Sequence, residues 1–124
     1  MICVDTSVII PWLEGDDYPE TARLDELLTA GQACVAPVTI TELMSDVRGA
    51  PAIGDMLLSF RVLDVADGYW ERAGALRAAL RRLKRKAPLG DALIAQACLD
   101  AQVPLLTRDA DFGVYAKLFG LELA

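Results

Sequence analysis

Carboxylate side chains follow four short apolar segments of this sequence. The acids are Asp5, Glu42, Asp91 and the pair Asp109 and Asp111, which come after residues 2–4, 35–38, 87–90 and 103–106, respectively. The chain has no histidine and only three scattered cysteines, so oxygen atoms are nearly the only metal ligands it offers. Carboxylates and water are the ligands that suit Mg²⁺ and Mn²⁺. The pattern indicates one acidic metal site assembled from distant segments.

Each of these acids also has a structural explanation. Asp5 and Asp109 could be N-caps of helices, and Thr39 with Glu42 matches a capping box. Asp91 comes where a helix is expected to begin, and the helix dipole favours a negative charge there. Spacing alone therefore leaves helix capping and metal binding open.

Apolar segments that alternate with helix-like segments set out the elements that would carry these acids. Strands are predicted over residues 2–4, 33–38, 61–65 and 103–106, with a possible edge strand over 121–123. Helices are predicted over residues 7–14, 19–30, 39–48, 53–59, 68–86, 91–102 and 111–119, with a break at 49–51.

Strands that alternate with helices, and that are apolar on both faces, indicate an α/β fold with a mainly parallel sheet of four to five strands, covered by helices. In such sheets, functional residues gather beyond the carboxyl ends of the strands. Asp5, Glu42 and Asp109 follow strands in this way, and Asp91 could reach the same edge from the start of its helix. Asp64 and Asp67 follow the third strand too, so the pattern is not confined to the candidate site.

Length and composition limit the class of protein. A chain of 124 residues is expected to form one domain, residues 1–124. No apolar stretch approaches the roughly 18 to 20 residues that span a bilayer, and the N-terminus lacks a basic leader, so we expect a cytoplasmic protein with no membrane partner. Cys3, Cys34 and Cys98 are expected to be small buried hydrophobic residues.

The net charge of −6 conceals a cluster of cations. Seven of the twelve basic residues lie between positions 72 and 86, in the predicted long helix. On a helix of about 3.6 residues per turn, Arg77, Arg81, Lys84 and Arg85 would share one face. That face could contact the phosphates of a nucleic acid, or it could simply be solvated.

Four motifs resemble those of the PIN-domain nucleases. They are residues 4–10 (VDTSVII), 39–44 (TITELM), 89–95 (LGDALIA) and 105–112 (LLTRDADF), and together they extend over nearly the whole chain. The similarity is to small members of the family that act as VapC-type toxins of toxin–antitoxin modules. This resemblance implies a three-layer α/β/α fold and a metal-dependent endoribonuclease.

The resemblance also implies roles for individual residues. Asp5, Glu42, Asp91 and Asp109 would be catalytic ligands of Mg²⁺ or Mn²⁺. Asp111 competes with Asp109 for the last place and is expected to support it. Ser7 would form hydrogen bonds within the acidic pocket, although a hydroxyl in the first turn of a helix has an ordinary structural role as well.

The resemblance also implies three partners, which are RNA as substrate, a cognate antitoxin and a second copy of the chain in a homodimer.

Two other classes of function stay open at this point. A phospho-receiver domain has a similar length and sheet, but it would need an acidic pair after the first strand and a lysine after the last, whereas Asp5 stands alone and no lysine follows Leu106 directly. A catalytically silent interaction module would be expected to have lost one or more of the acids.

Overall fold

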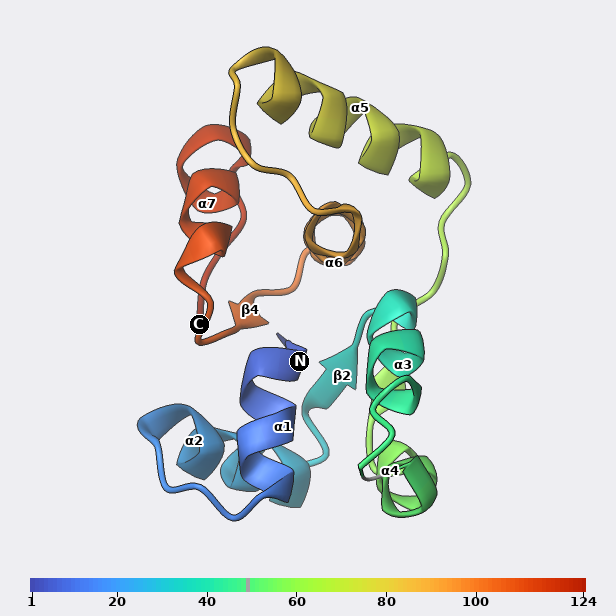
Figure 1. Ribbon diagram of the computed structural model, residues 1–124, viewed down its shortest axis with the longest axis vertical. Helices are drawn as coiled ribbons and strands as arrows, with labels where there is room; N and C mark the ends of the chain where they lie inside the picture. The colour runs from blue at the N-terminus through green and yellow to red at the C-terminus, as the bar shows by residue number, and fades with distance from the viewer. Residues whose placement is uncertain (49) are drawn as a thin grey trace.

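A parallel sheet forms the centre of the protein in its computed structural model, which describes residues 1–48 and 50–124 (Figure 1). The described strands are β1 (Ile2–Val4), β2 (Ala33–Val35), β3 (Arg61–Val62) and β4 (Leu105–Leu106). They lie in the order β3-β2-β1-β4, and each described pairing is parallel. Leu123 adds a single parallel bridge to Leu105, where the edge strand was expected. The predicted parallel sheet of four to five strands is confirmed.

Helices cover both faces of the sheet. They are α1 (Thr6–Leu13), α2 (Pro19–Thr29), α3 (Pro37–Met44), α4 (Ala50–Leu57), α5 (Tyr69–Arg82), α6 (Leu89–Ala101) and α7 (Gly113–Phe119), with the 3₁₀ turn η1 (Ala110–Phe112) before α7. Figure 1 shows α5, α6 and α7 on one side and α1 and α2 on the other, with α3 and α4 beside β2. This is the expected three-layer α/β/α arrangement. No helix in the described ranges is long and apolar enough to cross a membrane.

Alternation along the strands builds two cores. Successive residues of a strand point to opposite faces of a sheet. Cys3, Cys34 and Leu105 accordingly join the core beneath α5, α6 and α7, and Val4, Val35 and Leu106 join the core beneath α1, α2, α3 and α4. All three cysteines are buried and unbridged, as expected for small hydrophobic residues.

The strand order places the carboxyl ends of β1 and β4 side by side. From β1 the chain builds outward through β2 to β3, and it then returns to add β4 on the other flank of β1. The N–H of Asp5 donates to the carbonyl of Leu106 at 3.0 Å, so the two strand ends are joined by a hydrogen bond. A reversal of this kind is where open α/β sheets place their functional residues.

The second strand and the helix after it differ from the sequence-based expectation. β2 ends at Val35 instead of Val38, and α3 begins at Pro37. Proline has no N–H for a strand ladder, and its fixed φ suits the first position of a helix. Thr39 therefore lies inside the helix and the predicted capping box is absent, since the N-cap is Ala36.

The boundaries of other elements also shift. β3 and β4 are two residues each, shorter than predicted, and α6 begins at Leu89 instead of Asp91. α7 begins at Gly113, after the 3₁₀ turn. α4 begins at Ala50, inside the segment where a break was predicted, and Gly49 lies outside the described residues.

The long helix α5 ends at Arg82 and does not continue to Lys86. Lys84 adopts a left-handed conformation with φ of 57°, while its N–H donates to Arg81 and the N–H of Arg85 donates to Leu80. These two bonds are those of a Schellman motif, which ends helices. Leu83 is 59% exposed as a result, and it does not join the apolar stripe predicted for it.

Candidate functional site

The four acids predicted as metal ligands line one open hollow at the carboxyl edge of the sheet. The hollow has a volume of about 410 Å³ and is lined by Asp5, Thr6, Ser7, Ile10, Pro11, Glu42, Asp91 and Asp109. Asp5 follows β1, Glu42 lies on α3, Asp91 lies in the first turn of α6, and Asp109 follows β4. The fold therefore brings together side chains that are up to 104 positions apart in the chain.

Asp5 is the deepest of these acids and is held by hydroxyl groups. It is 4% exposed, and its Oδ2 accepts hydrogen bonds from Ser7 Oγ at 2.8 Å and from Thr107 Oγ1 at 2.9 Å. Asp5 is also the N-cap residue of α1, but its side chain makes no capping hydrogen bond within the described helix. Its carboxylate is therefore directed to the hydroxyl groups and the hollow.

Ser7 and Thr107 connect Asp5 to the backbone of the segment after β4 through hydrogen bonds. The backbone N–H of Arg108 donates to Ser7 Oγ at 2.9 Å, and that of Asp109 donates to Thr107 Oγ1 at 3.0 Å. Because each hydroxyl already accepts a backbone hydrogen, its own hydrogen is free to point to the carboxylate of Asp5. Ser7 thus donates a hydrogen bond to Asp5 while it accepts one from the backbone of Arg108.

Sequence reasoning missed Thr107. Its position offered a signal, because a threonine directly after β4 and two residues before Asp109 lies at the same sheet edge as Asp5. What could not be read from the chain is the contact itself, which joins residues 102 positions apart.

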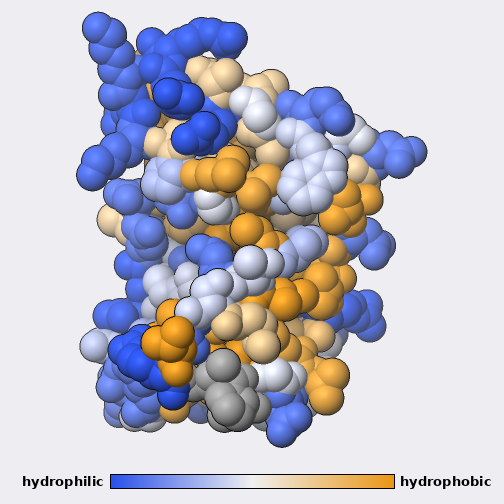
Figure 2. All heavy atoms as spheres, turned by 45° about the vertical axis from the view of Figure 1, so that its right-hand side comes forward, coloured by the Kyte–Doolittle hydropathy of each residue, from blue (hydrophilic) through white to orange (hydrophobic). Residues whose placement is uncertain are grey.

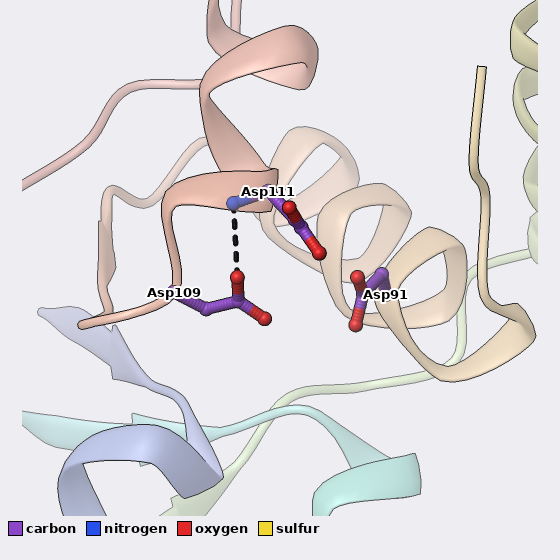
Figure 3. A group of neighbouring side chains, drawn as sticks. All are labelled: Asp91, Asp109 and Asp111. Carbon is purple, nitrogen blue, oxygen red and sulfur yellow. Dashed lines mark hydrogen bonds between the residues drawn. The ribbon is translucent and has the colours of Figure 1, made fainter.

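Asp91, Asp109 and Asp111 form the most compact group of acids. One carboxylate oxygen from each lies within 4.8 Å of the others, and Figure 3 shows the three side chains around a shared space between η1 and the start of α6. Asp109 Oδ1 accepts the backbone N–H of Asp111 at 2.9 Å, so Asp109 also caps the 3₁₀ turn, as its alternative role suggested. Asp111 is exposed and does not line the hollow.

The electrostatic state of Asp91 reflects this crowding. Burial, followed by the charges of Asp109, Asp5, Asp111 and Glu42, raises the pKa of Asp91 to about 6. Burial and the four neighbouring acids thus oppose the ionised form of Asp91, which a nearby cation would favour.

Glu42 approaches the site from α3, beside the start of α6. It is exposed at the edge of the hollow, yet burial of its carboxyl and the charge of Asp5 both raise its pKa. A Cβ built on Gly90 would lie only 3.2 Å from Glu42 Oε2. Gly90 therefore leaves room for the glutamate, a role that sequence reasoning also missed. Its signal was a glycine in a helix start directly before Asp91.

The predicted RNA-binding cations occupy two different environments. Arg77 is half-buried, and its Nε donates to the carbonyl of Ala87 at 2.7 Å, which fastens the linker between α5 and α6. Arg81 is exposed on the last turn of α5, and Lys84 and Arg85 are exposed in the linker. The expectation that all four share one helix face is wrong, because the Schellman motif ends the helix before Lys84.

Arg108 supplies a further cation at the edge of the sheet, two residues after the end of β4. Its guanidinium carbon lies 3.5 Å from the centroid of the Tyr18 ring, and its Nε lies 3.7 Å from Glu20 Oε2. These contacts tie the start of α2 to the segment that carries Thr107 and Asp109.

The donor set fits a hard divalent cation. Every candidate ligand is a carboxylate, which is the ligand type that Mg²⁺ and Mn²⁺ prefer. Burial first, and the charges of neighbouring acids second, raise the pKa values of Asp91 and Glu42, and a cation among these carboxylates would favour their ionised forms. The residues present therefore suit such an ion.

Comparison with known proteins identifies the fold. The PIN domain family profile matches residues 2–118. The structure of VapBC2 from Rickettsia felis, bound to a DNA fragment from its promoter, superposes with a TM-score of 0.78 at 17% identity, over 100% of this chain and 98% of that chain. VapBC-1 from nontypeable Haemophilus influenzae gives 0.77 at 20% identity, over 100% and 97%.

A third structure comes from VapBC-5 of Mycobacterium tuberculosis, which is described as a member of the VapBC family of toxin–antitoxin systems. It gives a TM-score of 0.70 at 25% identity, over 98% of this chain and 94% of that chain. No curated protein sequence matches the chain. The resemblance read from four motifs is confirmed by a profile that spans nearly all 124 residues, and it is favoured over the phospho-receiver alternative. The chain belongs to the PIN-domain family.

Proposed function

We propose that this protein is a metal-dependent endoribonuclease that hydrolyses RNA phosphodiester bonds, and that it is the toxin of a VapBC-type toxin–antitoxin pair. One observation carries the catalytic part of this proposal. Asp5, Glu42, Asp91 and Asp109 line a single hollow, where burial and then the charges of the neighbouring acids raise the pKa of Asp91 to about 6. Sites of this kind are built to hold a cation.

In this proposal the four carboxylates hold Mg²⁺ or Mn²⁺. A divalent ion at such a site lowers the pKa of a bound water and polarises the phosphoryl oxygens of a substrate. Asp109 is favoured over Asp111 as the fourth ligand, because Asp109 lines the hollow while Asp111 is exposed. Ser7 and Thr107 orient Asp5 by donating to its Oδ2, whereas its Oδ1 accepts only a long hydrogen bond of 3.5 Å from Thr6 Oγ1.

The cleavage assay uses purified protein with RNA substrates in Mg²⁺, in Mn²⁺ and in EDTA. Wild-type protein is expected to cleave only with metal, and Asp91→Asn is expected to be inactive. Asp64→Asn is the matched control, since Asp64 is an exposed acid that also follows a strand but does not line the hollow. Cleavage in EDTA, or by the Asp91 variant, would sink the mechanism.

The exposed cations Arg81, Lys84 and Arg85 are proposed to bind RNA phosphates on one side of the hollow. They belong to the segment that leads into α6, whose first turn carries Asp91. Arg77 was predicted with them, but its bond to Ala87 favours a role in fixing this linker. Phosphate contacts of this kind make affinity fall steeply with salt.

Charge reversal tests that assignment. Arg81→Glu combined with Arg85→Glu is expected to weaken RNA binding about tenfold or more at low salt and to flatten its salt dependence. The control is Arg23→Glu combined with Lys117→Glu, which changes the net charge equally at exposed positions on α2 and α7. Equal losses in the two double variants would mean that net charge, and not the linker, governs binding.

The toxin assignment rests on the VapBC structures that share the fold, and it carries with it a cognate antitoxin and a homodimer in the cytoplasm. Figure 2 shows the face formed by α3, α4 and the start of α5, where apolar side chains gather among charged ones. Exposed large hydrophobic residues on these helices, on the edge strand β3 and on the loop that follows it are Met44, Val62, Val65 and Trp70. Such patches are commonly sites of protein association.

Two experiments test the toxin assignment and the homodimer. Induced expression is expected to arrest bacterial growth, while Asp91→Asn is tolerated; tolerance of both would argue against a toxin. Light scattering of the purified chain is expected to give the mass of a dimer and Trp70→Glu that of a monomer. A monomeric wild-type protein would refute the homodimer.

A further inference from the structure

The hydroxyl group of Tyr115 is buried without a hydrogen-bond partner. The residue is 1% exposed, and its Oη has no hydrogen-bond partner among the described residues. Buried polar groups are nearly always paired, so an exception calls for an explanation such as a bound water, an ion or a functional role. In the described chain only Thr39 Oγ1 shares this condition.

Tyr115 lies on α7, in the core that α7 shares with α6. It is the third residue of α7, which directly follows the η1 turn that carries Asp111, and its ring packs against Phe112 and Phe119 with centroids 5.8 Å and 6.4 Å away. The carboxylate of Asp111 in turn lies within 4.8 Å of that of Asp91. The tyrosine thus shares a core cluster with Ile94 and Ala95 of α6, the helix whose first turn carries Asp91.

The charges that act on the hydroxyl agree with this position. Burial raises the pKa of Tyr115 to about 12, with the charge of Asp91 as the next cause, while Arg77 acts in the opposite direction. The hydroxyl is therefore within electrostatic reach of both the Asp91 carboxylate and the Arg77 guanidinium. Arg77 itself is fixed on the linker before α6 by its bond to Ala87.

We propose that Tyr115 is a positioning residue for Asp91, whose hydroxyl donates a hydrogen bond to that carboxylate, directly or through one water, when a metal ion fixes it in place. This inference rests on the proposed metal site. Ligating carboxylates are themselves usually held by hydrogen bonds, and removal of such a partner typically lowers metal affinity 10- to 100-fold. A hydroxyl left unpaired in the metal-free protein is available for that bond.

Tyr69 provides a matched control. It is 2% exposed, belongs to the same core cluster and also faces α6, but its hydroxyl donates to the carbonyl of Leu93 at 2.6 Å. Tyr115→Phe and Tyr69→Phe are therefore the same chemical change, made once at an unpaired hydroxyl and once at a paired one.

The test measures Mn²⁺ binding by calorimetry and unfolding by urea in EDTA, for the full chain and both variants. Tyr115→Phe is expected to lower Mn²⁺ affinity about tenfold or more while its urea midpoint stays equal or rises. Tyr69→Phe is expected to do the reverse, with a lower midpoint and Mn²⁺ affinity within about twofold of wild type.

Three results would overturn the inference, and they are distinguishable. Unchanged Mn²⁺ affinity in Tyr115→Phe, with normal binding by wild type, refutes the positioning role and leaves the proposed metal site intact. A lower urea midpoint in Tyr115→Phe, matching that of Tyr69→Phe, shows that the hydroxyl serves the fold. Failure of the wild-type chain to bind Mn²⁺ refutes the proposed function, and the role of Tyr115 with it.

Discussion

Replacement of Asp91 by asparagine is expected to stabilise the metal-free protein at neutral pH, although it removes a proposed catalytic residue. Burial and the surrounding acids raise the pKa of Asp91 from its ordinary value of 3.8 to about 6. The folded protein therefore opposes ionisation of this carboxyl, whereas the unfolded chain does not. Asparagine has nearly the same shape and carries no charge, so the variant avoids the cost of an ionised carboxyl at this position.

The sign and pH range follow from proton linkage. Between about pH 4 and pH 6 the folded state binds the proton of Asp91 more strongly than the unfolded state does, so the free energy of unfolding falls as pH rises. Above about pH 6 the decrease in the free energy of unfolding caused by Asp91 has its full size, and below about pH 4 it is absent. The advantage of Asp91→Asn should therefore be small near pH 4 and greatest at pH 7.

The pKa of Asp91 also sets an upper limit on the stability that Asp91→Asn can gain. A change from 3.8 to about 6 corresponds to about 3 kcal/mol. The side chain is only half-buried, and loss of a negative charge in the first turn of α6 removes roughly 0.3 to 1 kcal/mol of favourable dipole interaction. We therefore expect Asp91→Asn to raise the free energy of unfolding by about 1 to 2 kcal/mol at pH 7.

Urea denaturation in EDTA at pH 4, 5, 6 and 7 measures this difference. Asp100→Asn is the matched control on the same helix, because Arg72 hydrogen-bonds to Asp100 at 3.0 and 2.6 Å and lowers its pKa. A lowered pKa stabilises the fold above the unfolded value and loses that effect as pH falls. Asp100→Asn should therefore destabilise the protein at pH 7, and this deficit should shrink at pH 4.

Two results would refute this reasoning. If Asp91→Asn were less stable than wild type at pH 7 in EDTA, the ionised carboxylate would stabilise the start of α6 more than its burial and the neighbouring acids destabilise it. A stability gain of the same size at every pH would mean that ionisation is not its cause. Addition of Mg²⁺ should stabilise wild type more than the variant, since a ligand that binds only the folded state raises its stability.

Two further substitutions test the surroundings of the acids. Gly90→Ala places a Cβ 3.2 Å from Glu42 Oε2, so the flexible glutamate side chain must move. We expect weaker Mn²⁺ binding by calorimetry, with unchanged or higher thermal stability because alanine favours the helix. Unchanged Mn²⁺ affinity would contradict the role given to Gly90. Thr107→Val removes a donor to Asp5 and leaves the N–H of Asp109 without its acceptor, so the free energy of unfolding should fall by about 1 to 3 kcal/mol in urea. Thr107→Ser should restore most of that loss, and failure to do so would indicate that the methyl group matters instead.

The sequence predicted the type and order of the elements well because the signals are local. Apolar pairs such as Cys3 and Val4 require a strand with both faces covered, and Gly31 ends α2 in the left-handed conformation that glycine permits. Pro37 was a readable sign that β2 ends early. The end of α5 was not readable, because a lysine and not a glycine takes the left-handed position of the Schellman motif.

By itself, the sequence determined which chemical groups the protein carries and the edge of the sheet at which they gather. Parallel strands point their carboxyl ends the same way, so acids that follow β1 and β4 reach one edge whatever the details of packing. The tertiary structure alone decided the partner of each group. Asp5 meets Thr107, Glu42 meets Gly90 and Tyr115 is left unpaired, because hydrogen bonds and close contacts extend only a few ångströms and depend on how distant segments pack.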